Sequence, residues 1–482
     1  MSILLAQTSD QQAQQVVQRG LELLSSPGGL MAVVVLLGLL TVGVLNESGW
    51  KGLLLSLLLL ATLVDGSTKF FNNTLFFPLE QLRSGSQILN GLVLAAIAVA
   101  TLRGPGGVRL KIVAVIAVAL LCFEIFFGLR LFFAGRVLRG ALVLVSFVIL
   151  FTAIPMGIGR RLQSDRDLQS LIQVIGLVGV PYVVLNVMQY LFASNYTVTQ
   201  GRFAGISGNP QSAGLILSLL TITMIWLISR PRSSRWTAPV FGVAVGVCGL
   251  LLVWTGSRTS VLATVVGMAV IFRKRLATMV VVGGFVLLAV FVTSLFLGDG
   301  EDLLERVSST KNTRAEVWLV GLQEFLRYPI FGTLGMGDDV DLKVVESTPI
   351  QTLQVLGVVG FAFIAIVYGA IFAALRRLIV LRRAMPERGP MFDYVIGMWS
   401  AILLMSMFEA VFLGVITFFT IMIYLLTAMT AYLIDPGVDG WSQEERDEDF
   451  DDDSHGEFER ESDERLEDDP DPDTHGSVPT TA

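Results

Sequence analysis

Long apolar runs constrain this chain more than any other feature, because they recur from near the N-terminus to about residue 434. Hydrophobic residues make up 53% of the chain and the mean hydropathy is +0.69, whereas soluble domains average roughly 45–50% apolar residues. About 20 apolar residues in a helix cross the bilayer core, which is about 30 Å thick. We therefore predict an all-α, polytopic transmembrane helix bundle of about 12 to 14 spans. The predicted spans are 29–46, 51–65, 87–102, 110–130, 140–157, 168–193, 211–230, 237–254, 257–272, 277–297, 349–376, 393–413 and 414–434.

The formal charge of −7 averages two unlike parts of the chain. From Asp435 onwards there are 20 acidic residues and 3 arginines, whereas the rest has 31 basic and 21 acidic residues. A segment so rich in like charge cannot bury enough apolar surface to fold. We predict a glutamine-rich, candidate amphipathic N-terminal segment (1–28) without a cleavable signal, a membrane bundle (29–434), and a disordered acidic tail (435–482). The tail either solubilises the protein or docks onto a basic cytoplasmic partner.

Basic residues predict the orientation of the bundle, because loops rich in lysine and arginine remain in the cytoplasm. On the predicted map, five basic clusters share one side, which leaves 66–86, 194–210 and 298–348 facing outward and the tail in the cytoplasm. Arg130, Arg136 and Arg139 fall on the outer side and depart from the rule. The clusters are Arg103/Arg109/Lys111, Arg160/Arg161/Arg166, Arg230/Arg232/Arg235, Arg273/Lys274/Arg275 and Arg376/Arg377/Arg382/Arg383/Arg388.

The large external loop, 298–348, contains a short amphipathic helix. Its apolar residues recur at helical spacing from Thr313 onwards, and the helix should end at Tyr328, because the residue before a proline leaves the α region. After a glycine-rich stretch, Thr348 has the position of an N-cap with Pro349 at the first helical position. The loop therefore resembles a lid over one end of the bundle.

Three arginines in outward-facing positions are candidate substrate-binding residues. Arg202 precedes Gly208-Asn209-Pro210 at the start of one span, Arg258 lies in the opening turn of another, and Arg314 lies in the first turn of the lid helix. A cation opposes the helix dipole there, at a cost of about 0.3–1 kcal/mol, whereas an anion between the arginine and the free N–H groups is stabilised. Snorkelling of each arginine to the interface is the alternative. Three similar positions favour a shared diphosphate site.

These motifs resemble the superfamily of bacterial O-antigen ligases and O-antigen polymerases. The matching pieces are Arg202 with Gly208-Asn209-Pro210, Thr255-Gly256-Ser257-Arg258, Arg314 followed by Trp318, Pro329, Gly332 and Gly335, and the segment from Leu353 to Gly360. The resemblance covers roughly residues 170–430. It implies a bundle similar to type C glycosyltransferases and a glycan donor linked through diphosphate to a polyprenol at the outer leaflet of the bacterial cytoplasmic membrane. An acceptor hydroxyl, on a glycan, a lipid or a protein, would attack this donor.

The same resemblance implies a reaction without nucleotide sugar, metal or other cofactor, and we expect no nucleic-acid partner. Within the residues themselves, Cys122 and Cys248 lie in apolar spans and favour packing over a disulfide or metal pair. Both histidines, His455 and His475, lie in the acidic tail.

Three carboxylates complete the candidate set. Many family members carry a histidine followed by an asparagine before the span that ends in the glycine pair, whereas this chain has Glu346 and Ser347. A carboxylate can accept the proton of an attacking hydroxyl, so Glu346 is the candidate general base; the alternative is that it caps the helix or pairs with Arg314. Glu124 and Glu409 lie within spans, where acids usually face the bundle interior. Glu409 is a candidate for an acceptor groove, and a structural ion pair is the alternative for both.

A second class of function stays open at this point. A lipid-glycan flippase or transporter would bind the same headgroup without chemistry, and a catalytically inactive scaffold is a third reading. Transporters often show inverted repeats and charged residues near the bilayer midplane. Because the candidate arginines gather at one face and no internal repeat is visible, the sequence favours the enzyme.

Overall fold

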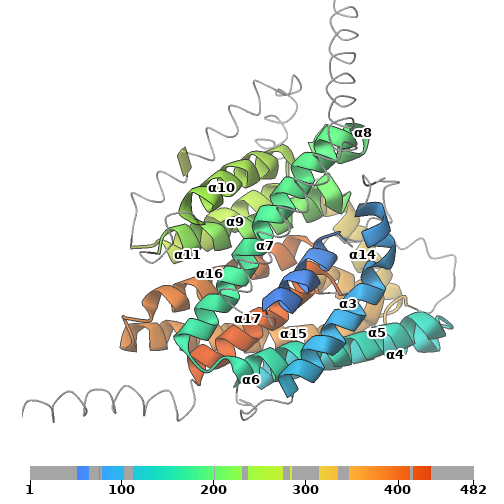
Figure 1. Ribbon diagram of the computed structural model, residues 1–482. Coiled ribbons are helices and arrows are strands. Elements are labelled where there is room, and N and C mark those ends of the chain that lie inside the picture. The colour runs from blue at the N-terminus through green and yellow to red at the C-terminus, as the bar shows by residue number, and fades with distance from the viewer. Residues whose placement is uncertain are drawn as a thin grey trace, which may run out of the picture. The chain divides into compact units, whose positions relative to one another are not determined.

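The computed structural model describes residues 52–64, 75, 79–102, 112–199, 201–230, 237–274, 283–284, 314–334, 347–412 and 416–435. These residues form an all-α bundle (Figure 1), and the described exceptions are the short strands β1 (Val198–Thr199) and β2 (Arg202–Phe203), which pair antiparallel. The longer α-helices are α3 (Leu79–Leu102), α4 (Ile112–Phe133), α5 (Val137–Phe151), α7 (Asp165–Phe192), α9 (Pro210–Ile228), α10 (Thr237–Trp254), α11 (Arg258–Ile271), α14 (Arg314–Arg327), α15 (Thr348–Ala384), α16 (Gly389–Phe408) and α17 (Phe418–Ile434).

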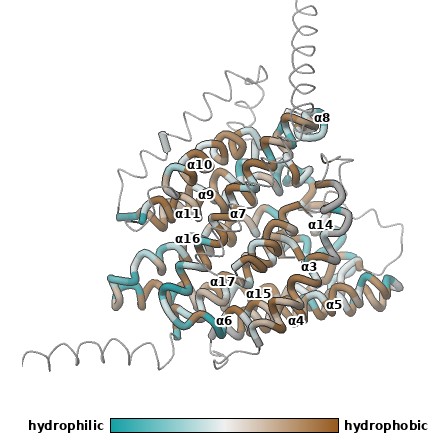
Figure 2. Tube along the Cα trace, viewed as in Figure 1, coloured by the Kyte–Doolittle hydropathy of each residue, from teal (hydrophilic) through white to brown (hydrophobic). Residues whose placement is uncertain are grey.

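Among the residues that the structure describes, six helical segments are long and apolar enough to cross a membrane, so the chain is a multi-pass membrane protein. They are Val115–Phe133, Val137–Arg161, Asp165–Phe192, Pro210–Ile228, Thr348–Ala384 and Gly389–Phe408. Shorter apolar helices occupy the other predicted spans that the structure describes: Gly52–Val64, Leu89–Thr101, Ala238–Trp254, Arg258–Ile271 and Phe418–Ile434. The predicted span 29–46 and, apart from residues 283–284, the span 277–297 lie outside the described residues, as do the segments 1–28 and 436–482. Figure 2 shows that hydrophobic residues predominate along these helices.

Local sequence chemistry explains where several helices begin. The Asn209 side chain accepts a hydrogen bond from the Gln211 backbone N–H at 2.8 Å, with Pro210 as the first residue of α9, as expected for an N-cap followed by proline. Capping boxes open α7 at Ser164/Asp167 and α17 at Thr417/Thr420. After α5 the chain continues as a π-helical turn, Thr152–Ile158, which contains Pro155, a residue that cannot donate a helical hydrogen bond.

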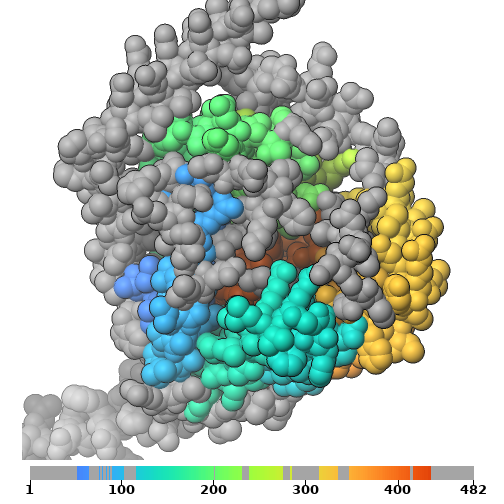
Figure 3. All heavy atoms as spheres, turned by 90° about the vertical axis from the view of Figure 1, so that its right-hand side faces the viewer, coloured from blue at the N-terminus to red at the C-terminus, as the bar shows by residue number. Residues whose placement is uncertain are grey.

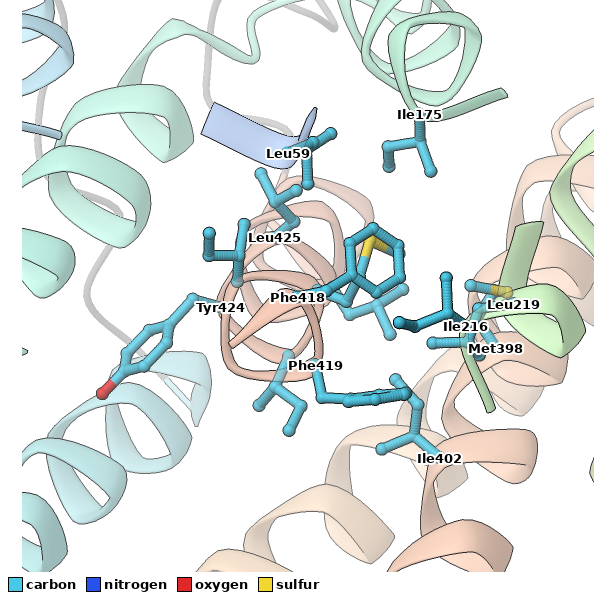
Figure 4. Close-up of a cluster of buried hydrophobic side chains, with 14 of the residues drawn as sticks. Leu59, Ile175, Ile216, Leu219, Met398, Ile402, Phe418, Phe419, Tyr424 and Leu425 are labelled. Atoms are coloured by element: carbon cyan, nitrogen blue, oxygen red, sulfur yellow. The ribbon is translucent and has the colours of Figure 1, made fainter. Parts of the chain in front are cut away.

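Buried apolar side chains hold the bundle together around α17. Figure 4 shows Phe418, Phe419 and Leu425 of α17 among Leu59, Ile216 and Met398 of other helices. Nearby, α11 packs closely on α16, because a Cβ on Gly397 would lie only 2.8 Å from the Gly267 carbonyl oxygen, a close approach typical of helix pairs in membranes. This contact fixes α11 against α16.

Helix α15 is broken in its first third. Gly357 has φ 66° and ψ −162°, a conformation that is essentially restricted to glycine. The turn that follows α14 packs against this break through backbone hydrogen bonds. The Thr333 N–H donates to the Gln354 carbonyl, and the Val358 N–H donates to the Pro329 carbonyl, each at 2.8 Å. The apolar run at 349–376 therefore contains two helical pieces in place of the continuous span that the sequence predicted.

Candidate functional site

The turn between α10 and α11 is the centre of the candidate site. Helix α10 ends at Trp254, Gly256 adopts φ 60°, and the Ser257 side chain accepts the Ser260 N–H, so that Ser257 is the N-cap of α11. Arg258 is consequently the first residue of α11 and its side chain is exposed. We refer to residues 255–259 as the α11 turn.

Arg202 contacts the beginning of this turn. It lies in β2, and its Nε donates a hydrogen bond to the Thr255 carbonyl at 2.7 Å. The start of α9 packs against the same place, since a Cβ on Gly214 would lie within 3.0 Å of the side chains of Thr255, Ser257 and Ser260. The carbonyl satisfies one Arg202 donor without cancelling its charge.

Arg314 contacts the end of the α11 turn from the lid helix α14. Its Nη1 donates to the Thr259 hydroxyl at 3.1 Å and its Nη2 to Glu409 Oε1 at 2.5 Å. The guanidinium lies 5.9 Å from the centre of the Phe408 ring, on which Trp318 is stacked at 6.2 Å. The Arg314 side chain is 22% exposed and that of Glu409 only 8%, so the ion pair is fixed from the buried side and reachable from the exposed side.

The structure thus brings the three predicted arginines to one short stretch of chain. Arg202 and Arg314 contact Thr255 and Thr259, at its two ends, and Arg258 lies between them. Five consecutive residues span at most about 15 Å between their first and last Cα atoms. With three arginines and Glu409, the group carries a formal charge of +2.

Glu409 is the ion-pair partner of Arg314. Of the two roles that the sequence left open, an acceptor groove and a structural ion pair, this contact corresponds to the ion pair. Glu409 follows Phe408 at the end of α16. Its backbone is also held, because the Thr348 hydroxyl donates to the Glu409 carbonyl at 2.8 Å and accepts the Val411 N–H at 3.1 Å. The start of α15 is therefore tied to the end of α16.

The predicted N-cap role of Thr348 is wrong. Ser347 is the N-cap of α15 and makes no side-chain capping bond. The Thr348 hydroxyl instead forms hydrogen bonds with the backbone of Glu409 and Val411. Sequence reasoning missed Thr348 and Thr259 as members of the group. Thr259 had one available signal, its place next to Arg258; nothing in the sequence marked a contact between Thr348 and residues more than 60 positions away.

Arg130 holds the turn after the lid helix. From α4, its Nη2 donates to the carbonyls of Phe331 and Leu334 at 3.1 and 2.6 Å, and its guanidinium lies 5.4 Å from the Phe331 ring centre. Gly332 and Gly357 face each other's backbone so closely that a Cβ on either would collide with the other segment. Figure 3 shows α14 and this turn in gold at the right-hand edge of the molecule. Arg130 thus belongs to the lid end of the bundle.

Glu346, the candidate general base, lies outside the described residues, whereas its chain neighbour Ser347 is buried at the start of α15. Glu124 is buried in α4. Cys122 and Cys248 are free thiols. In the described part of the chain, no group of three or more His, Cys, Asp or Glu residues is placed to hold a metal ion.

No protein-family model matches this chain, and no curated protein matches it either. The resemblance to the O-antigen ligase and polymerase superfamily therefore rests on the motifs of the sequence alone.

Proposed function

We propose that this protein is a membrane glycosyltransferase that uses a polyprenyl-diphosphate-linked glycan as donor and transfers or polymerises the glycan onto an acceptor hydroxyl. The observation that supports it most is the meeting of Arg202, Arg258 and Arg314 at the α11 turn. A diphosphate carries closely spaced negative charges, and arginine recognises phosphate through paired, charge-assisted hydrogen bonds. The N-terminus of α11 adds free backbone N–H groups and the positive end of its dipole.

The chemistry assigned to this site is nucleophilic substitution at the anomeric carbon. The acceptor hydroxyl oxygen forms a bond to that carbon while the bond to the diphosphate oxygen breaks, and the electron pair leaves with the polyprenyl diphosphate. The proton of the hydroxyl passes to the carboxylate of Glu346. The arginines stabilise the negative charge that develops on the departing diphosphate, and stabilisation of this kind often accounts for most of the reduction in an enzyme's reaction barrier.

Glu409 acts in this proposal by positioning Arg314. Its carboxylate, mostly buried, fixes one side of the guanidinium and Thr259 fixes another. A donor that is already fixed needs little reorganisation when charge develops. The Arg314 side chain is partly exposed, so an anion can approach its guanidinium from that side.

The proposal includes an orientation and a place. The α11 turn faces the outer leaflet of a bacterial cytoplasmic membrane, where the lipid-linked donor is presented, and the acidic tail lies in the cytoplasm, where it either solubilises the protein or docks onto a basic partner. The bundle is then a type C-like glycosyltransferase of surface polysaccharide assembly, such as O-antigen. The basic clusters on the opposite loops support this orientation.

The test is turnover of a polyprenyl-diphosphate oligosaccharide by the purified full-length chain in lipid nanodiscs. We expect product with the wild type and a loss of about 100- to 1,000-fold in Arg258→Ala and in Arg314→Ala, the range seen when a charge-stabilising donor is removed. Arg327→Ala is the matched control, since Arg327 is exposed at the other end of α14. Equal turnover in all variants contradicts the proposal. Binding of the donor without any product favours the flippase or transporter reading.

A further inference from the structure

A second polar site lies inside the bundle at Glu124. Glu124 is in the second half of α4 and only 2% exposed, and its Oε2 atom has no hydrogen-bond partner among the described residues. The structure describes two other buried carboxylates, Asp393 and Glu409, and both are in salt bridges with arginine. Glu124 therefore differs from both of them in its surroundings.

Glu124 lines a small cavity together with Tyr424 of α17. The Tyr424 side chain is 1% exposed, and its hydroxyl also has no hydrogen-bond partner in the described part of the chain. In Figure 4 this hydroxyl points away from the hydrophobic side chains grouped around α17. The remaining walls are apolar except for Thr420, and no lysine or arginine contributes to them in the described ranges.

An ionised carboxylate is very costly in such a place. Without a cation nearby, nothing offsets the hydration that the charged group loses on leaving water. A neutral carboxylic acid avoids this cost and becomes a donor as well as an acceptor. A phenol has the same double capacity, so the two groups can share one small molecule between them.

We propose that Glu124 and Tyr424 form an intramembrane proton site, in which a neutral carboxylic acid and a phenol together bind one water-sized hydrogen-bonding molecule. The geometry that supports it is two buried polar groups lining one cavity with space for about one water. The cavity is also lined by Val411 and Phe412, which follow Glu409 closely in the chain. The site thus lies beside the segment that carries Glu409, and it does not depend on the proposed transferase activity.

Infrared spectroscopy of the full chain in nanodiscs at neutral pH tests this proposal, because it reports the protonation of a carboxyl group without any reagent reaching it. The difference spectrum between wild type and Glu124→Gln should contain the carbonyl band of one protonated carboxylic acid. Glu409→Gln is the matched control and should remove the bands of an ionised carboxylate. Loss of ionised-carboxylate bands in Glu124→Gln would overturn the proposal.

Tyr424→Phe tests the second half of the proposal and keeps the acid in place if Glu124→Gln fails to fold. We expect the protonated carbonyl band to persist in this variant and to move to higher frequency, because the acid loses part of its hydrogen bonding. Exchange into heavy water should shift the band in the wild type, since the acid proton is shared with an exchangeable molecule. A band that is absent in Tyr424→Phe and wild type alike, or that does not move between them, rejects the shared site.

Discussion

The two ends of α16 use arginine in different ways. Asp393 and Glu409 mark these ends, 16 residues apart in sequence, which corresponds to about 24 Å along a helix. At the Asp393 end, Arg382 and Arg273 both pair with Asp393, and Arg388 pairs with Asp165 at 2.8 Å, where the Tyr432 hydroxyl also donates. At this end each of these arginines meets a carboxylate.

At the Glu409 end, the hydrogen bonds of the arginines include several to neutral acceptors. Arg202 donates to a carbonyl of the α11 turn, and Arg130 donates to two carbonyls of the turn after α14. Arg314 is paired with Glu409 and also donates to the Thr259 hydroxyl. A carbonyl accepts a hydrogen bond but carries no formal charge, so these bonds do not neutralise a guanidinium as a carboxylate does. The comparison teaches that carboxylates tie arginines to neighbouring helices at the Asp393 end, whereas the arginines at the Glu409 end include those that our proposal assigns to an anion.

The largest effect on stability should come from Asp393→Ala. Removal of this carboxylate leaves the Arg382 guanidinium buried, with 9% of its side chain exposed, and breaking a buried pair costs about 3–5 kcal/mol. Unfolding in detergent measures this cost, with Glu387→Ala as the control because Glu387 is exposed in the neighbouring turn. Turnover per folded molecule should stay at the wild-type level. A cost below about 1 kcal/mol would show that this end is not held by its ion pairs.

A smaller loss should follow Gly357→Ala at the break in α15. The backbone conformation there costs about 1–3 kcal/mol for a residue other than glycine, and the added methyl would collide with the Ile330 carbonyl. Gly369→Ala is the matched control in the same helix, because a Cβ there meets nothing within 4 Å, and it should be neutral or stabilising by up to about 1 kcal/mol. Thermal unfolding of each variant, and its proteolysis at the turn after α14, measure the two effects. Equal behaviour of the two variants would contradict the docked turn.

The smallest effect should be that of Glu409→Gln. The amide oxygen can still accept a bond from Arg314, so we expect a loss of activity of about tenfold or less, whereas Glu409→Ala should lose more, since a hydrogen bond to a charged group contributes about 1.5–3 kcal/mol. Turnover of Glu409→Ala, Arg314→Ala and the double variant forms a cycle. If Glu409 acts through Arg314, the double variant should be about as impaired as Arg314→Ala. Additive losses would show that Glu409 acts independently.

The sequence predicted the helices well because hydropathy and capping are local properties. The lid helix was expected from Thr313 to Tyr328 and α14 runs from Arg314 to Arg327. Asn209 and Pro210 open α9 as expected. The meeting of Arg202 and Arg314 at the α11 turn was also expected, because the predicted topology put these arginines on the same, outer side of the membrane.

Partners that are distant in the chain could not be predicted. Arg314 and Glu409 are 95 positions apart, and Arg130 lies about 200 positions before the carbonyls it binds. The break at Gly357 was hidden inside a continuous apolar run, because its cause is the backbone of residues 329–334. Thr348 had the spacing of a helix cap in the sequence, although its hydroxyl bonds to the backbone of Glu409 and Val411, which are distant in the chain.

Equilibrium binding of a polyprenyl diphosphate and of the matching monophosphate, to purified protein in nanodiscs at one ionic strength, tests most directly whether the arginines at the α11 turn form one anion site. We predict that the wild type binds the diphosphate at least about tenfold more tightly, equivalent to about 1.4 kcal/mol. Arg258→Ala and Arg314→Ala should lose most of this preference, and Arg327→Ala should keep it. Equal affinity of the wild type for both lipids, or an unchanged preference in Arg258→Ala and Arg314→Ala, would contradict the account.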